Sequence, residues 1–74
     1  MKSMSCNQLG GACEKLFSGE TFDDIAQQSQ QHGKEMFALN DDNHLAAMDK
    51  MMEIMQSGKM DSWMAARKAE FDAL

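Results

Sequence analysis

Hydrophobic and polar positions divide the 74-residue chain into three consecutive zones with different periodicities. In the first zone, residues 1–19, the segments 2–6 and 14–18 are two short candidates for extended strands, and the first alternates polar with larger side chains. Gly10 and Gly11 lie between them and allow a turn with positive φ at no steric cost. The pattern predicts a short β-hairpin with a wide loop.

A helix start follows the hairpin. Thr21 and the aspartate three residues after it have the spacing of a capping box, with Asp in place of the usual Glu or Gln. The residues that then recur at helical spacing are Phe22, Ile25, Ala26, Ser29 and His32. His32 lies two turns after Ile25, so we expect it on the buried face. The helix is expected to end at Gly33 or to continue through residues 34–37.

Residues 40–74 have the periodicity of two helices. The first carries a seam formed by Leu45, Met48, Met52 and Met55, and Gly58 ends it. The second has an expected cap at Asp61 or Ser62, and its shared face consists of Met60, Met64, Phe71 and Leu74, with Trp63 beside it. Short connections make the two helices antiparallel neighbours, with the Met stripe as the core between them.

These elements predict one small α+β domain over residues 1–74. Its first half, residues 1–37, is a zinc-finger-like ββα unit with an N-terminal two-stranded β-hairpin and a helix. Its second half, residues 40–74, is a C-terminal helical hairpin.

The apolar content of the chain is unusual for a folded domain. Nine residues are Met, there is no Val, Tyr or Pro, and Leu, Ile and Phe together number 11 of 74, below the ~20% at which disorder has to be considered. Met has three rotatable bonds and specifies a core weakly. A core of this size rarely supplies more than about 3–5 kcal/mol. The composition therefore predicts that something other than apolar packing stabilises the fold.

Charge and hydropathy exclude several classes of protein. Twelve Asp and Glu against seven Lys and Arg give a net charge of −5, so the chain offers no basic face for nucleic acid or for an anionic membrane surface. No apolar run approaches the ~18 residues that span a bilayer. The first eight residues lack the apolar core of a signal peptide. We expect a cytoplasmic protein that binds neither nucleic acid nor membrane.

Two cysteines and two histidines are the candidate metal ligands. They occur in the order Cys6, Cys13, His32 and His44, with the spacing C-x6-C-x18-H-x11-H. A hairpin that presents two thiolates, followed by a helix that presents a histidine, is the arrangement of a zinc finger, and zinc prefers four tetrahedral sulfur and nitrogen ligands. Both the Cys–Cys and the His–His intervals are wider than in typical structural zinc sites.

The same residues carry a family resemblance. Residues 1–13, Phe17, the segment Gly19-Glu20-Thr21 and His32 resemble the family catalogued as domain of unknown function 1059, small proteins predicted to bind metal. The resemblance covers the first half of the chain closely and the Met-rich half loosely. It implies that Cys6, Cys13 and His32 are metal ligands.

The fourth ligand departs from the commonest family pattern. Many members have a second histidine shortly after the first, where this chain has Phe37, and others place it further along, at the position of His44. The sequence leaves open a Cys2His2 site with His44 and a Cys2His site completed by water or by a carboxylate such as Glu35 or Asp41.

Other interpretations of these residues also stay open. Cys6 and Cys13 can be buried free thiols, or a disulfide, which a reducing compartment disfavours. His32 can be a hydrogen-bonded core residue, and His44 can cap a helix. An exposed, low-pKa cysteine would indicate thiol redox switching. No Met-x-x-Met run lies at the cysteines to favour copper(I), and the segment Asp41-Asp42 is too short for a calcium loop.

The sequence predicts a small metal-binding protein with a structural zinc ion and no catalytic activity. It contains no phosphate loop and no acid–base pair on one helical face, and a chain this short has little room for a deep pocket. The alternative is a protein-interaction module with a Met-rich helical surface, which docks an unknown protein partner or a second copy of itself. We expect a monomer or a weak dimer.

Overall fold

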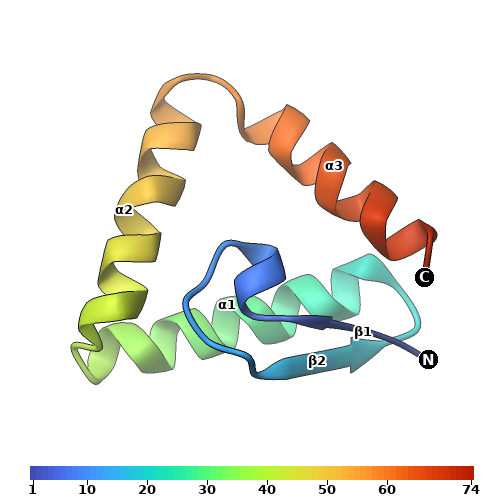
Figure 1. The fold of residues 1–74 in the computed structure, drawn as a ribbon, viewed down its shortest axis with the longest axis horizontal. Helices are drawn as coiled ribbons and strands as arrows, with labels where there is room; N and C mark the ends of the chain where they lie inside the picture. Colours follow the sequence, from blue (N-terminus) through green and yellow to red (C-terminus); the bar gives the residue numbers. More distant parts are fainter.

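In the computed structural model, which describes all of residues 1–74, the chain forms a two-stranded antiparallel hairpin followed by three helices, an α+β fold (Figure 1). Strand β1 (Lys2–Ser5) pairs with β2 (Leu16–Gly19) in a register that places Met4 opposite Phe17. Both of these side chains are buried on one face, and the hydroxyls of Ser3 and Ser18 hydrogen-bond across the other face at 2.7 Å. The alternation of the first zone therefore gives the expected hairpin.

The connection between the strands is folded back on itself. One 3₁₀ turn (Asn7–Leu9) follows β1 and ends at Gly10, whose φ of 90° is left-handed. Two backbone hydrogen bonds extend the pairing beyond the strands, from Cys6 N–H to the Lys15 carbonyl (2.7 Å) and from Asn7 N–H to the Cys13 carbonyl (2.9 Å). The loop is thus closed at its base, and it holds both cysteines.

Helix α1 (Phe22–Ala38) starts at the expected capping box. The Thr21 hydroxyl accepts from the Asp24 amide and the Asp24 carboxylate accepts from the Thr21 amide. The helix passes through Gly33, which has no positive φ, and ends where Asn40 adopts a φ of 54°. The amides of Asn40 and Asp41 bond the carbonyls of Phe37 and Met36, which is the Schellman pattern of a helix C-terminus.

The apolar core lies between the hairpin and α1. Its seven residues are Met4, Cys6, Leu9, Phe17, Phe22, Ile25 and Phe71. Phe71 comes from the last helix, and its ring meets that of Phe22 edge-on with centroids 6.0 Å apart. The Lys2 ammonium lies 4.7 Å from the centroid of the Phe71 ring and donates to the Phe71 carbonyl at 3.1 Å.

The second half of the chain is not the antiparallel helical hairpin expected from the sequence. Helix α2 (Asp42–Gln56) and helix α3 (Met60–Asp72) diverge from their connection and form an arch above the hairpin and α1 (Figure 1). Gly58, with a φ of 77°, ends α2 as expected. The helices diverge because each is held elsewhere: the C-terminal end of α3 packs on the core through Phe71, and α2 begins at the end of α1.

Two further details of this half differ from the sequence prediction. The Met stripe is not a core, because Met52 and Met55 on α2 are 49% and 53% exposed. The last helix begins at Met60 after Lys59, which makes no side-chain capping bond, so neither Asp61 nor Ser62 is its cap. None of the helices combines the length and the apolar character needed to cross a bilayer.

Candidate metal centre

The loop of the hairpin brings backbone amides to the sulfurs of both cysteines. The amides of Ala12 and Cys13 donate to the Cys6 sulfur, and the Lys15 amide donates to the Cys13 sulfur. Gly11 makes this close approach possible: a Cβ atom at position 11 would lie 2.2 Å from Cys6 Sγ and 3.0 Å from the Cys6 carbonyl oxygen. The backbone therefore wraps around Cys6 at a distance that only glycine permits.

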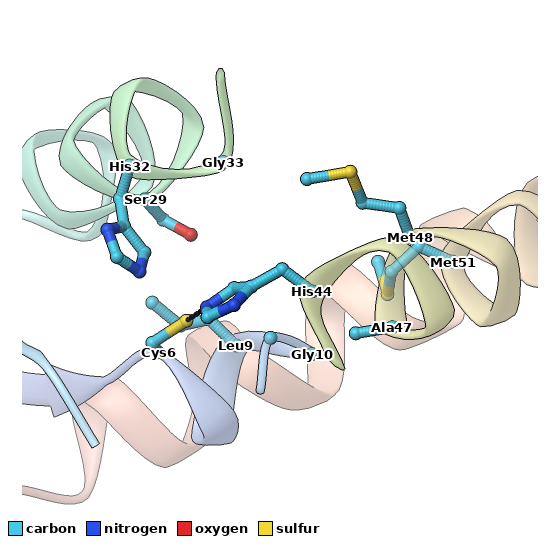
Figure 2. A pocket seen from close by; sticks show the side chains of 11 residues that line it. Cys6, Leu9, Gly10, Ser29, His32, Gly33, His44, Ala47, Met48 and Met51 are labelled. Atoms are coloured by element: carbon cyan, nitrogen blue, oxygen red, sulfur yellow. Dashed lines mark hydrogen bonds between the residues drawn. The ribbon is translucent and has the colours of Figure 1, made fainter. Parts of the chain in front are cut away.

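Two helices each bring a histidine to the cysteines, and Figure 2 shows both imidazole rings beside Cys6. His32 lies on the buried face of α1, as its spacing from Ile25 predicts, and its Nε2 is 3.3 Å from Cys13 Sγ. His44 lies in the first turn of α2, and its Nε2 is 3.6 Å from Cys6 Sγ. The two imidazole rings meet edge-on, with centroids 5.2 Å apart and planes at 80°.

All four ligand atoms converge on one point. The two Sγ atoms and one nitrogen of each imidazole lie within 4.8 Å of one another. A tetrahedral zinc ion with Zn–S of about 2.3 Å and Zn–N of about 2.0 Å separates sulfur from nitrogen by about 3.5 Å. The two measured Sγ–Nε2 distances, 3.6 and 3.3 Å, are close to this value. The donor set and its dimensions fit a Cys2His2 metal site.

Asp41 orients His44 without belonging to the cluster itself. Its Oδ2 accepts from His44 Nδ1 at 2.5 Å and also from the backbone amide of His44 at 3.0 Å, as the N-cap of α2. A proton held on Nδ1 leaves the Nε2 lone pair directed at the sulfurs, as in the carboxylate–histidine pairs of zinc proteins. Of the two carboxylates considered as a fourth ligand, Asp41 thus binds the histidine, and Glu35 lies outside the cluster.

The other histidine has no such support. Nδ1 of His32 is buried and has no hydrogen-bond partner. Its ring packs against Phe17, with centroids 5.6 Å apart, and against His44. Packing rather than hydrogen bonding therefore holds the His32 ring in place.

Burial and hydrogen bonds shift the pKa values of these groups in different directions. Burial raises the pKa of the Cys6 thiol, whereas the bond from the Lys15 amide lowers the pKa of Cys13. Burial also lowers the pKa of His32 and so favours the neutral ring that a metal requires. The hydrogen bond between Asp41 and His44 raises the pKa of His44 and lowers that of Asp41.

A hollow of about 120 Å³ adjoins the cluster on the side of α2. Cys6, His32 and His44 form one wall, and Met48 and Met51 form another (Figure 2). The two thioethers are not part of the group of four ligand atoms. The cluster can be reached from this hollow, which separates part of α1 from α2.

Sequence reasoning named all four clustered residues but missed two that support them. Residues 40–43 have the composition of a turn or cap cluster and Asp41 is also a candidate ligand, but neither interpretation predicts its bond to the His44 ring, although Asp41 lies three residues before His44, the spacing between an N-cap side chain and the amide that donates to it. The sequence predicts that Gly10 and Gly11 both serve the turn, but only Gly10 has a positive φ, and Gly11 is needed for its close approach to the Cys6 sulfur. No sequence signal distinguishes a glycine needed for a turn from one needed for the approach of a sulfur atom.

Comparisons with known proteins add no relative. Searches against protein-family models, curated proteins and solved structures found no match. The resemblance to the family domain of unknown function 1059 stays a prediction based on the residues that carry it.

Proposed function

We propose that this protein binds one zinc ion through Cys6, Cys13, His32 and His44 and that the ion stabilises its fold. One observation carries the proposal: the only two cysteines of the chain, in the hairpin loop, and its only two histidines, on α1 and α2, place their ligand atoms within 4.8 Å of one another. The resemblance to a family predicted to bind metal supports the same assignment.

The chemistry of the donors favours zinc in a structural role. Two sulfur and two imidazole ligands are a common donor set of structural zinc, which is tetrahedral and has no redox chemistry of its own. Four protein ligands fill the tetrahedron and leave no position for a substrate or a water nucleophile. We therefore propose that the protein is not an enzyme at this site.

The size of the core explains why an ion would matter. Seven buried residues form the apolar core, and a domain of this length rarely obtains more than about 3–5 kcal/mol from packing. Structural zinc sites in small peptides bind with an apparent free energy of about 10–16 kcal/mol near pH 7. Zinc would thus exceed the core as a source of stability.

Native mass spectrometry of freshly purified, reduced protein tests the proposal, together with thermal unfolding before and after chelation. We expect one zinc per chain and a lower melting temperature after chelation. Cys13→Ser should lose the metal, and Met52→Leu, at an exposed site on α2, is the matched control that should keep it. Substoichiometric metal combined with an unchanged melting temperature would refute the proposal.

A second function is favoured by the exposed methionines. Met52, Met55 and Met64 are 49%, 53% and 39% exposed, and a hollow of about 240 Å³ with mostly apolar walls lies between α1 and the arch. We propose as the alternative that this Met-rich surface binds an unidentified protein partner or a second copy of the chain. Sedimentation over a range of concentrations tests self-association, and a strict monomer at all concentrations would exclude the second copy.

A further inference from the structure

We propose that the metal acts as a latch for helix α2: the metal-loaded chain holds α2 against α1, and the metal-free chain releases α2 while its hairpin and α1 stay folded. This inference rests on the proposed zinc site. It goes beyond structural zinc in general, because it assigns the effect of the metal to one helix and makes the protein a metal-dependent conformational switch.

The burial of α2 is the first argument. Only one of its 15 residues is buried, and that residue is the ligand His44, which is 6% exposed. By comparison, α1 buries Phe22 and Ile25 in addition to its own ligand. Buried apolar area is what attaches most helices to a domain. Apart from His44, every side chain of α2 is at most half-buried, so the bond at His44 is its principal attachment.

The space around α2 is the second argument. The hollow of about 120 Å³ lies where α2 faces α1, and Met51 also borders the hollow of about 240 Å³ beneath the arch. At Gly33, the point of α1 that faces Met48, an added Cβ would still be 3.9 Å from Met48 Cε. Met51 approaches Gly10 closely, since an added Cβ there would lie 2.7 Å from the Met51 sulfur. Packing along α2 is therefore thin on both sides.

The composition of the core is the third argument. Its seven residues come from the hairpin and its loop, from α1 and from α3, and none comes from α2. Release of α2 therefore removes no residue from the core. Phe71 keeps its contact with Phe22, so the C-terminal end of α3 has its own attachment. The arch is held at two points, by the metal at His44 and by the core at Phe71.

Release of α2 changes which surface the protein presents. In the latched state Met48 and Met51 are half-buried, and they line the same hollow as Leu9 and Gly10 of the cysteine loop. Moving α2 away exposes the thioethers and the apolar loop together. The occupancy of the metal site is thereby converted into the exposure of a Met-rich surface.

Hydrogen exchange with and without metal tests the latch. The metal-free, reduced chain is titrated with Co²⁺, whose absorption with thiolate ligands reports occupancy, and amide exchange is followed by mass spectrometry. Without metal we expect residues 42–56 to exchange about tenfold faster or more, while the amides of β1, β2 and α1 keep their protection. Addition of Co²⁺ or Zn²⁺ should restore the protection of α2.

The outcomes separate the latch from the metal site itself. Stoichiometric cobalt binding with equal exchange of α2 in both states overturns the latch and leaves the proposed function standing. Loss of protection in α1 and the hairpin as well as in α2 overturns the latch, because the metal would then hold the whole fold. Absence of cobalt binding overturns both proposals.

A variant removes the latch without removing the other three ligands. His44→Ala should leave α2 in fast exchange even with excess Zn²⁺, while α1 stays protected. Asn43→Ala, at the exposed neighbouring position, is the matched control and should behave as the unmodified chain. A zinc-loaded His44→Ala chain with a protected α2 would overturn the latch.

Discussion

Replacement of Gly11 by alanine tests the geometry of the site most directly. The new Cβ would stand 2.2 Å from Cys6 Sγ, and ordinary contact begins at 3.4 Å, so the sulfur or the loop has to move by about 1.2 Å. Zinc–ligand distances tolerate about 0.2 Å. Relief of the clash is therefore incompatible with the metal bond. Overpacking of this kind costs about 1–3 kcal/mol, which corresponds to a loss of zinc affinity of about 5- to 140-fold.

Competition with a chromophoric zinc chelator measures this loss. Gly33→Ala is the matched control, because its Cβ meets only Met48 Cε at 3.9 Å and because alanine inside a helix is more favourable than glycine by about 0.5–1 kcal/mol. We expect Gly33→Ala to bind zinc normally and to melt at a slightly higher temperature. Equal zinc affinities of the two variants would refute the placement of the cysteine loop described above.

Three other predictions concern the support of the site, its protonation and the core. Asp41→Asn keeps an N-cap but exchanges the carboxylate at His44 Nδ1 for an amide. Because the side chain of Asp41 is 41% exposed, we expect about a tenfold loss of zinc affinity, at the lower end of the range for such partners. Unchanged affinity in chelator competition would exclude the orienting role. Zinc affinity should fall by about 10- to 100-fold per pH unit below pH 7, because burial raises the pKa of Cys6 and zinc must displace its proton, while the lowered pKa of Cys13 makes the second thiol contribute less to this slope. The slope should steepen where the histidines protonate, His44 first because its pKa is raised. A pH-independent affinity would contradict this ligand set. Phe71→Ala should lower the free energy of unfolding of the zinc-loaded protein, measured in urea, by about 3 kcal/mol or more. Leu74 is 61% exposed, so Leu74→Ala should change it by less than about 0.5 kcal/mol. Equal effects would show that α3 is not attached through Phe71.

The first half of the fold could be predicted from sequence because its signals are local. The alternation around Met4, the glycine pair and the capping box at Thr21 each determine structure within a few residues, and the structure has a hairpin and a helix there. The arrangement of α2 and α3 could not be predicted in this way. A periodic Met stripe indicates that a helix has an apolar face, but it does not indicate what covers that face, and here Met52 and Met55 stay exposed.

The sequence was enough to predict the four ligands of the candidate site, but not the interactions that orient them. Cysteine and histidine are rare in this chain, so their types alone selected the four residues that the structure brings together. The pairing of each histidine with a particular sulfur depends on the crossing of α1 and α2, which no spacing rule gives. The role of Asp41 depends on the same turn, because its carboxylate meets the His44 ring only when α2 starts at Asp42.

The tight turn between α1 and α2 also limits how the length of the chain can vary. Asn40 ends α1 in the left-handed region, and the next residue, Asp41, already caps α2. Each residue inserted into α1 after His32 would turn the rest of the chain by about 100° and advance it by about 1.5 Å, which carries His44 off the sulfurs. The interval of eleven residues between the histidines, too wide for the usual zinc-finger spacing, is therefore the length of a helix end, a turn and a new first turn. Single-residue insertions and deletions should be tolerated in the connection around Gly58, outside both helices, and not between the two histidines.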